Sequence, residues 1–236
     1  MLFRKPKAAS LRTCLIHKVP ARQYAENKNA FYTTHAEFVA SASSLERIPH
    51  LQGLPEVVVT GRANCGKSSL FNAVLGRRSL LNTSQKAGRT RTLNFYHVGT
   101  EPPKLVLVDA PGYGARGRPE WGKLFDGYLE TRKELKRVFI LFNAKHPLNT
   151  FDTMMLTHLS EILVSQRERF TLQAVITKVD DISLDEVGGA VKRIREGIRE
   201  VTHLCLPPIV TSAKMQPPFG IEEVRKNIGQ ACGLKL

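Results

Sequence analysis

Short apolar segments alternate with helical patterns along most of the chain. Five of these segments are typical of strands, and they lie at residues 57–60, 105–108, 138–142, 172–177 and 209–211. Because they alternate with helices, they predict a mainly parallel sheet that is covered on both faces. A sixth strand is expected at residues 93–98, antiparallel at an edge, since only a short connection separates it from Leu105. The expected fold is α/β, with a mainly parallel six-stranded sheet, one antiparallel edge strand and helices on both faces.

Three helices are indicated after the middle of the chain. Ser183 and Glu186 form a capping-box pattern that opens a helix to about Glu200. A second amphipathic pattern runs from Phe151 to Gln166, and a closing helix is expected at Gly220–Cys232. The residues of the second helix that are expected to face inward are Met154, Met155, Leu159, Ile162 and Leu163. These apolar positions are interpreted as core, not as a cofactor pocket.

The segment after the first strand carries the strongest chemical signal. It matches the pattern G-x-x-x-x-G-K-[ST], and its residues are Gly61, Arg62, Ala63, Asn64, Cys65, Gly66, Lys67 and Ser68. In such a phosphate-binding loop the backbone N–H groups surround the phosphates, the lysine reaches the β- and γ-phosphates, and the serine hydroxyl binds Mg²⁺. Ser69 and an apolar helical pattern follow, as this kind of loop requires. The loop predicts a site for a phosphorylated nucleotide.

Two aspartates follow later strands, where an open α/β sheet places its ligand. Asp109, in Asp-Ala-Pro-Gly, can hold Mg²⁺, although an aspartate also commonly opens an ordinary Pro-Gly turn. Asp180, in Thr177-Lys178-Val179-Asp180, can accept two hydrogen bonds from the N1–H and N2–H₂ edge of guanine. Adenine does not offer that pair of donors, so Asp180 predicts specificity for guanine.

The order of these motifs resembles that of GTPases, with phosphate loop, D-x-P-G and T-K-x-D. The resemblance implies that Lys178 packs along the base and that Thr177 belongs to the guanine site. It also implies that the Ser212-Ala213-Lys214 segment forms the last guanine-binding loop, with the Ala213 N–H facing the base.

Further segments resemble the EngB/YihA type of GTPase. They are Gly-Arg-Ala-Asn-Cys-Gly-Lys-Ser-Ser-Leu-Phe-Asn at 61–72, Gly-Arg-Thr-Arg-Thr-Leu-Asn-Phe at 88–95, Asp-Ala-Pro-Gly-Tyr-Gly at 109–114, and His146-Pro147 followed by Asp152 and Met154. The resemblance covers about residues 50–232 and implies a P-loop GTPase domain that serves assembly of the large ribosomal subunit. The chain departs from the family at Asn143-Ala144-Lys145-His146, where D-x-R-H is usual, and at Cys65 and Asp181.

The resemblance also implies the chemistry, which is attack of water on the γ-phosphate of GTP. Lys67 and Gly112 are expected to act at the γ-phosphate, and Thr90, after Gly88, to bind Mg²⁺ only while that phosphate is present. Tyr113 stands where many small GTPases carry a water-positioning glutamine, so slow intrinsic turnover is expected. In related GTPases an asparagine at the position of Asn64 helps to hold a potassium ion where an arginine finger would otherwise sit, so the resemblance implies activation by potassium. The alternative is that Asn64 only stabilises the loop through its own backbone hydrogen bonds.

The charge of the chain indicates a polyanionic partner. The formal net charge is +14, and without the first 25 residues 29 basic and 21 acidic residues remain. Residues 57–100 contain no acid, and their basic residues besides Lys67 are Arg62, Arg77, Arg78, Lys86, Arg89 and Arg91. This segment predicts contact with ribosomal RNA through shape and phosphate, the alternative being a solvated surface that complements GTP.

The N-terminal segment has the composition of an organelle transit peptide. It is rich in arginine and lysine, has no acid before Glu26 and lacks a long apolar core. Arg22-Gln23-Tyr24-Ala25 resembles a site for the matrix processing protease, so residues 1–24 are expected to be a mitochondrial transit peptide, 25–49 an N-terminal extension and 50–236 the EngB-type G domain. The mitochondrial matrix is favoured over chloroplast or cytoplasm, and the alternative is a basic arm that binds RNA.

Other classes of site and function remain to be weighed. The four cysteines, at 14, 65, 205 and 232, lack the spacing of a zinc site or a disulfide scaffold, and no apolar run is long enough to span a membrane. A monomer is favoured. The alternative functions are a GTP-binding scaffold with negligible turnover and a related GTPase that acts on tRNA modification or on membranes.

Overall fold

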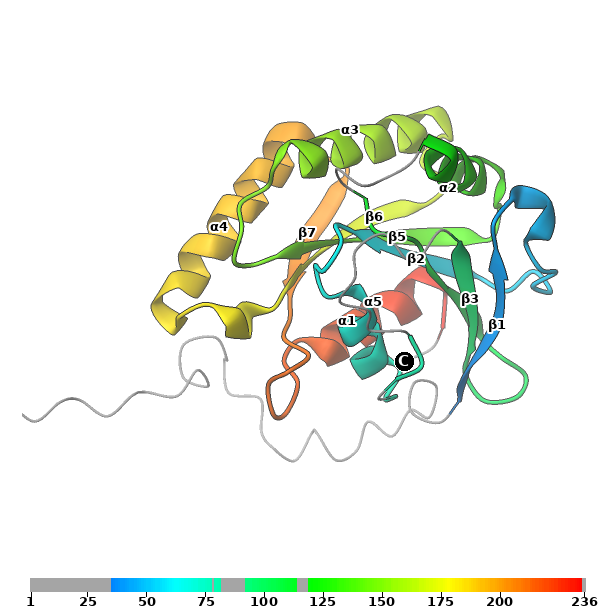
Figure 1. The fold of residues 1–236 in the computed structure, drawn as a ribbon, viewed down its shortest axis with the longest axis horizontal. Helices are drawn as coiled ribbons and strands as arrows, with labels where there is room; N and C mark the ends of the chain where they lie inside the picture. The colour runs from blue at the N-terminus through cyan, green and yellow to red at the C-terminus, as the bar shows by residue number, and fades with distance from the viewer. Residues whose placement is uncertain (1–34, 78, 82–91, 114–118, 235–236) are drawn as a thin grey trace, which may run out of the picture.

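A computed structural model describes residues 35–77, 79–81, 92–113 and 119–234, and within this range not the side chains of residues 119–121. The described residues form one seven-stranded sheet (Figure 1). Its strands are β1 (Ala36–Ala42), β2 (Glu56–Gly61), β3 (Leu93–Val98), β4 (Leu105–Asp109), β5 (Leu135–Asn143), β6 (Thr171–Thr177) and β7 (Cys205–Val210).

The strand order is β1-β3-β4-β2-β5-β6-β7. Strands β4, β2, β5, β6 and β7 are parallel neighbours, whereas β3 is antiparallel to both β4 and β1. The predicted α/β fold, mainly parallel with an antiparallel strand on one side, is confirmed. The five parallel strands carry their carboxyl ends to one edge of the sheet, and this edge holds the nucleotide motifs.

Two details of the predicted sheet are wrong. The sheet has a seventh strand, β1, within the segment that was predicted to be an N-terminal extension, and β3 therefore lies inside the sheet, not at its edge. Strand β1 escaped detection because its pattern is weak. Phe38 is 52% exposed, and an irregularity between Phe38 and Ala40 breaks the alternation of inward and outward side chains.

Helices cover both faces of the sheet (Figure 1). On one face lie α1 (Lys67–Val74) and α5 (Ile221–Ala231), and on the other lie α2 (Pro119–Thr131), α3 (Thr150–Ser165) and α4 (Leu184–Val201). Short 3₁₀ turns occur at Leu45–Arg47 and Val179–Asp181. Among the described residues, none of these helices combines the length and the apolar character that a membrane crossing demands.

The three helices expected from the sequence are confirmed as α3, α4 and α5. The backbone N–H of Ser183 donates to Glu186 at 3.1 Å, as the capping pattern predicts. The expected inward orientation of Met154 is wrong, because this side chain is 62% exposed. Leu159, Ile162 and Leu163 are buried as predicted, together with Leu156, which was not predicted. Met154 precedes Leu156 by about half a helical turn, which places it on the opposite side of the helix.

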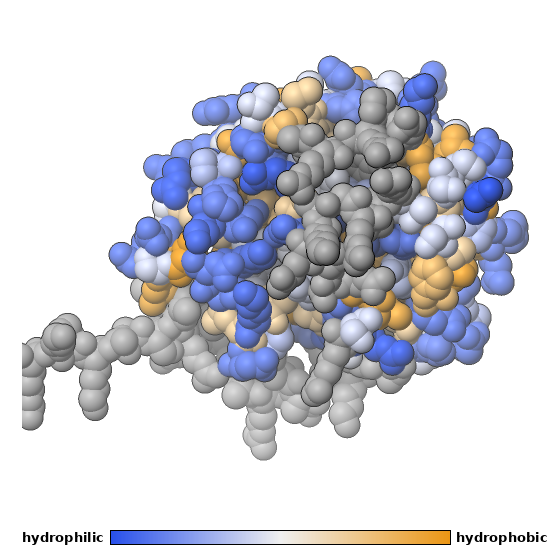
Figure 2. Space-filling view, viewed as in Figure 1, coloured by the Kyte–Doolittle hydropathy of each residue, from blue (hydrophilic) through white to orange (hydrophobic). Residues whose placement is uncertain are grey.

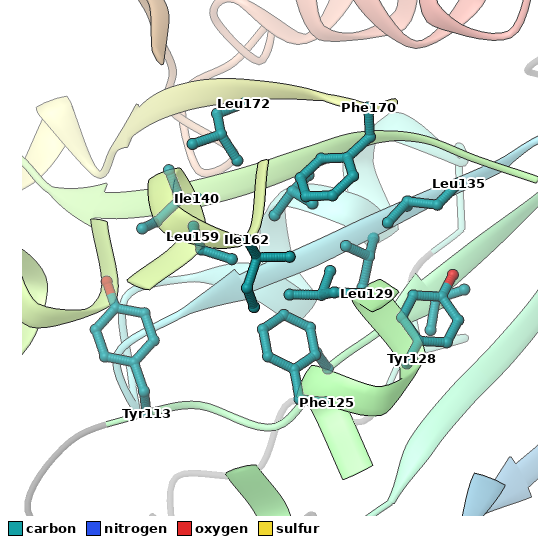
Figure 3. Close-up of a cluster of buried hydrophobic side chains, with 14 of the residues drawn as sticks. Tyr113, Phe125, Tyr128, Leu129, Leu135, Ile140, Leu159, Ile162, Phe170 and Leu172 are labelled. Carbon is teal, nitrogen blue, oxygen red and sulfur yellow. The ribbon is translucent and has the colours of Figure 1, made fainter. Parts of the chain in front are cut away.

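The larger core cluster lies between the sheet and α2, α3 and α4. Figure 3 shows Phe125 and Leu129 of α2 near Ile162 of α3, with Tyr128 on the other side of Leu129, below Leu135. The described surface in the view of Figure 2 is mostly hydrophilic, with scattered apolar residues. Burial of two continuous apolar layers fixes the strands, so the loops at their carboxyl ends start from rigid positions.

Candidate nucleotide-binding site

The phosphate loop connects β2 directly to α1. Gly66 precedes the first helical residue and has φ 103°, a left-handed conformation that an L-residue with a side chain rarely adopts. Lys67 opens α1, and its Nζ donates to the carbonyl oxygens of Gly61 at 3.2 Å and Arg62 at 3.5 Å. The ammonium group therefore lies across the loop that precedes it. The N–H groups at the N-terminus of α1 and this ammonium suit an anion.

The remaining loop residues differ in exposure. Ala63, Asn64 and Ser69 are exposed, and Ser68 is half-buried in the first turn of α1. Cys65 is buried, and burial raises the pKa of its thiol, which keeps it protonated. Cys65, where the chain departs from the EngB pattern, therefore packs in the core and not on the exposed side of the loop.

Asp109 ends β4 next to the phosphate loop. It is 8% exposed, and its Oδ1 has no hydrogen-bond partner among the described residues. Burial raises the pKa of this carboxyl group to about 6, against the opposing effects of Lys67 and of a hydrogen bond from Asn94. A buried carboxylate oxygen without a donor is costly, so this one is suited to a cation or its water ligand.

Gly112 lies against the phosphate loop. A Cβ atom at this position would come within 2.9 Å of the Ala63 nitrogen and 3.1 Å of the Gly61 oxygen. A side chain there would push the two backbones apart. The close approach requires glycine and places the turn after Asp109 directly beside the loop.

Tyr113 and Arg62 converge on Asp152 at the start of α3. The Tyr113 side chain is 5% exposed and ends the buried cluster (Figure 3), and its hydroxyl donates to Asp152 Oδ1 at 3.0 Å. The Nε of Arg62 lies 3.1 Å from the same oxygen. The tyrosine at the usual glutamine position is therefore held by protein groups in this structure.

The Thr177–Asp180 segment, which is predicted to bind guanine, is hydrogen-bonded to the phosphate loop. Thr177 Oγ1 lies 2.5 Å from the Cys65 carbonyl oxygen and 3.1 Å from that of Phe142, so its proton is directed to the protein. Lys178 has φ 57°, and its Cε lies 3.5 Å from where a Cβ on Gly66 would stand. The stem of Lys178 thus lies close to Gly66 of the phosphate loop, and its packing along the base stays a prediction.

The last loop contacts the guanine aspartate. Ser212 Oγ donates to Asp180 Oδ1 at 2.5 Å and accepts from the backbone N–H of Lys214 and Met215. Asp180 and Ala213 are both half-buried. The hydroxyl of Ser212 fixes the orientation of the Asp180 carboxylate, which retains lone pairs for other donors.

The structure brings together most of the residues expected at the site. Loops after β2, β4, β6 and β7 supply them, although Gly88 and Thr90 lie outside the described residues. Asp152 was given no role from the sequence. Its presence in the His-Pro…Asp-x-x-Met stretch was the available signal, but that stretch does not reveal which groups Asp152 contacts.

Comparison with known proteins identifies the family. Residues 56–178 match the family model described as 50S ribosome-binding GTPase. The GTP-binding protein EngB of Rhodopseudomonas palustris is 36% identical over 197 residues, which cover 81% of this chain and 87% of that protein. EngB of Cereibacter sphaeroides is 34% identical over 194 residues, or 80% and 84% of the two chains. The chain belongs to the EngB family of GTPases. This EngB-type protein binds GTP and GDP, and it is a GTP hydrolase.

Solved structures with lower identity agree on the fold. Era of Aquifex aeolicus bound to GDP·AlF₄⁻ superposes with a TM-score of 0.54 at 21% identity, covering 76% of this chain and 57% of that one. A GTP-binding protein from Sulfolobus solfataricus in complex with GDP gives 0.50 at 21% identity, covering 76% and 52%. The EngB-type chain spans a little over half the length of these two proteins.

Proposed function

We propose that this EngB-type GTPase is a molecular switch in the assembly of the large ribosomal subunit of mitochondria. The match of residues 56–178 to a family described as ribosome-binding GTPases carries the proposal. The net charge of +14 supports it, because a strongly basic protein is attracted to RNA.

The site supports recognition of GTP at both ends of the nucleotide. Lys67 and the N–H groups of the loop and of α1 suit the phosphates, with Ser69 at the margin, and Asp180 suits the guanine edge. Thr177 joins the two halves through its bond to the Cys65 carbonyl. Hydrolysis then depends on the position and charge of groups around the γ-phosphate, among which we place Lys67, Gly112 and Thr90.

Magnesium fits the donor set of this site. Asp109 supplies a buried carboxylate oxygen without a partner among the described residues, and Ser68 supplies a half-buried hydroxyl at the start of α1. We propose that these residues and Thr90 hold Mg²⁺, which when bound neutralises negative charge on the phosphates.

The position of Tyr113 favours slow intrinsic hydrolysis, because its hydroxyl is engaged with Asp152. We propose that potassium raises the rate through Asn64, which is exposed and has φ 63°. Turnover measured in KCl should exceed turnover in NaCl at the same ionic strength. Equal rates in the two salts would remove potassium and leave Asn64 as a residue that only shapes the loop.

Contact with ribosomal RNA is proposed at the acid-free segment 57–100. Arg77 is exposed, whereas Arg78, Lys86, Arg89 and Arg91 lie outside the described residues. Substitution of Arg77 by Gln should weaken binding to large-subunit particles and reduce its salt dependence by about one released ion. Lys192→Gln is the matched control, since Lys192 is exposed on α4 at the other face of the sheet. Equal effects of the two substitutions would speak against this surface.

Depletion of the protein tests the assembly role directly. We expect mitochondrial large-subunit precursors to accumulate, and to be matured by the restored wild-type chain but not by Lys67→Ala. Normal subunit maturation after depletion would refute the assembly role, while GTP hydrolysis by the purified protein would still stand. Import into isolated mitochondria with cleavage after Tyr24 would support the proposed location.

A further inference from the structure

Asp152 is a buried acidic residue at which three segments meet. Its side chain is 1% exposed. One segment is the phosphate loop, through Arg62, the second is the turn after Asp109, through Tyr113, and the third is the start of α3, through Asn149. These three segments are far apart in sequence.

The two carboxylate oxygens of Asp152 have separate tasks. Oδ2 accepts from the backbone N–H of Asn149 at 3.0 Å, and this closes the capping box of α3. Oδ1 takes no part in the cap and instead meets the Tyr113 hydroxyl at 3.0 Å and Arg62 Nε at 3.1 Å. A capping box needs only one acceptor oxygen, so the second pair of contacts requires another explanation.

The contacts at Oδ1 connect the phosphate loop, through Arg62, to the turn after Asp109, through Tyr113. Arg62 and Tyr113 are also joined as a parallel bridge pair, and between them Gly112 lies within close range of Ala63. Lys67 reaches back to the Gly61 and Arg62 carbonyls within the same loop. The lysine of such a loop acts on the β- and γ-phosphates, so the bridged turn stands at the end where the γ-phosphate is transferred.

We propose that Asp152 is a positioning residue for GTP hydrolysis, which holds the Gly112-Tyr113 turn against the phosphate loop through Tyr113 and Arg62. This inference rests on the GTPase activity of the family and on the placement of Gly112 at the γ-phosphate, and it is independent of the ribosomal role. Burial and the nearby Asp152 raise the pKa of Tyr113, so its hydroxyl stays protonated and remains a hydrogen-bond donor to Asp152 at neutral pH.

The test compares three single variants of the purified full chain and the double variant Asp152→Asn/Tyr113→Phe. Asp152→Asn keeps the volume and an acceptor for the cap but no longer pairs with Arg62. Tyr113→Phe removes one hydroxyl and leaves the ring in the core. Asn149→Ala is the matched control, because it removes the Asn149 side chain that accepts from the Asp152 N–H and leaves Oδ1 unchanged. For each variant, kcat, KM for GTP, Kd for GDP and the unfolding midpoint are measured.

We expect Asp152→Asn to lower kcat by about 10- to 100-fold, because small displacements of reacting groups have effects of this size. Tyr113→Phe should lower kcat by a smaller factor, and the double variant should be no slower than Asp152→Asn alone. The Kd for GDP should change by less than about 3-fold, since the turn is expected to serve the γ-phosphate. Asn149→Ala should lower the unfolding midpoint and leave kcat unchanged.

Three results would overturn the proposal. The first is an unchanged kcat in both Asp152→Asn and Tyr113→Phe, which would reduce Asp152 to a helix cap. The second is an equal loss of kcat in Asn149→Ala, which would make the position of α3 responsible. The third is a loss of GDP affinity as large as the loss of kcat, which would indicate a disordered phosphate loop. If Asp152→Asn does not fold, Tyr113→Phe decides on the same three criteria.

Discussion

Two buried carboxylates lie at opposite ends of neighbouring parallel strands, and their surroundings differ. Glu56 begins β2 and is fully buried, and it accepts from the Tyr128 hydroxyl at 2.5 Å and from the Arg132 guanidinium. Asp109 ends β4 with Oδ1 unpartnered among the described residues, and burial raises the pKa of its carboxyl group to about 6. The first carboxylate is satisfied by the fold, whereas the second is not.

The contrast separates a structural charge from a functional one. A buried charge persists in a folded protein only when donors or a bound ion compensate it. At Glu56 the compensating donors come from Tyr128 in α2 and from Arg132 just after it, so this carboxylate needs no bound ion. At Asp109 the described residues leave one carboxylate oxygen without a donor, which is why this group is the proposed magnesium ligand.

The largest expected effect is on GTP hydrolysis, which should depend on Asp109 but not on Glu56. Asp109→Asn should lower kcat/KM for GTP by at least about 100-fold, because a charged group at the reacting phosphates is lost. Glu56→Gln should leave kcat unchanged per folded molecule. Steady-state hydrolysis at saturating Mg²⁺ measures both, and comparable losses in the two variants would erase the distinction.

The next effect concerns stability at the other end of the sheet. Glu56→Gln should lower the free energy of unfolding by about 3 kcal/mol, because it breaks a buried charge pair and leaves the Tyr128 hydroxyl and Arg132 with a poorer acceptor. Urea unfolding at neutral pH measures the change. A value near zero would mean that the pair contributes no more than a surface salt bridge.

In the absence of ligand, Glu56→Gln and Asp109→Asn should change the free energy of unfolding in opposite directions. The pKa of Asp109 is raised from its usual 3.8 to about 6, so the folded state binds the extra proton and its stability from this group falls as pH rises from about 4 to 6. At pH 7.5 Asp109→Asn should be more stable than wild type by about 2 kcal/mol, since the amide is also buried but carries no charge. At pH 4 the two should be equal. A variant that is less stable at pH 7.5 would contradict the raised pKa.

The smallest expected effect concerns a third carboxylate, Asp180, which the protein satisfies only in part. Ser212→Ala removes its hydroxyl donor and should weaken GDP binding about 5-fold, the equivalent of one net hydrogen bond of about 1 kcal/mol. Titration calorimetry measures the affinity, with Ser160→Ala on α3 as the matched control. An unchanged affinity would show that Asp180 keeps its orientation without the serine.

The sequence was sufficient for those parts of the fold and site that depend on local pattern. Apolar runs identified the five parallel strands, and the spacing of Lys67, Asp109 and Asp180 assigned three loops to one edge of the sheet. Strand β1 was missed because an edge strand buries few side chains, so its pattern carries little signal. The contacts of Asp152 were missed because they join residues 90 and 39 positions away, and such pairing follows from tertiary packing alone.

The position of strand β1 bears on the proposed removal of residues 1–24. It begins at Ala36 and pairs with β3 from Ala36↔Val98 to Ala42↔Leu93, covering the outer edge of that strand. A protease that cut within or after β1 would remove the strand that covers β3. The exposed backbone donors and acceptors of β3 could then pair with a second molecule. Cleavage after Tyr24 leaves β1 intact, whereas a fragment that starts at residue 50 lacks it. Among the described residues the sheet therefore begins at Ala36, well before the first nucleotide motif.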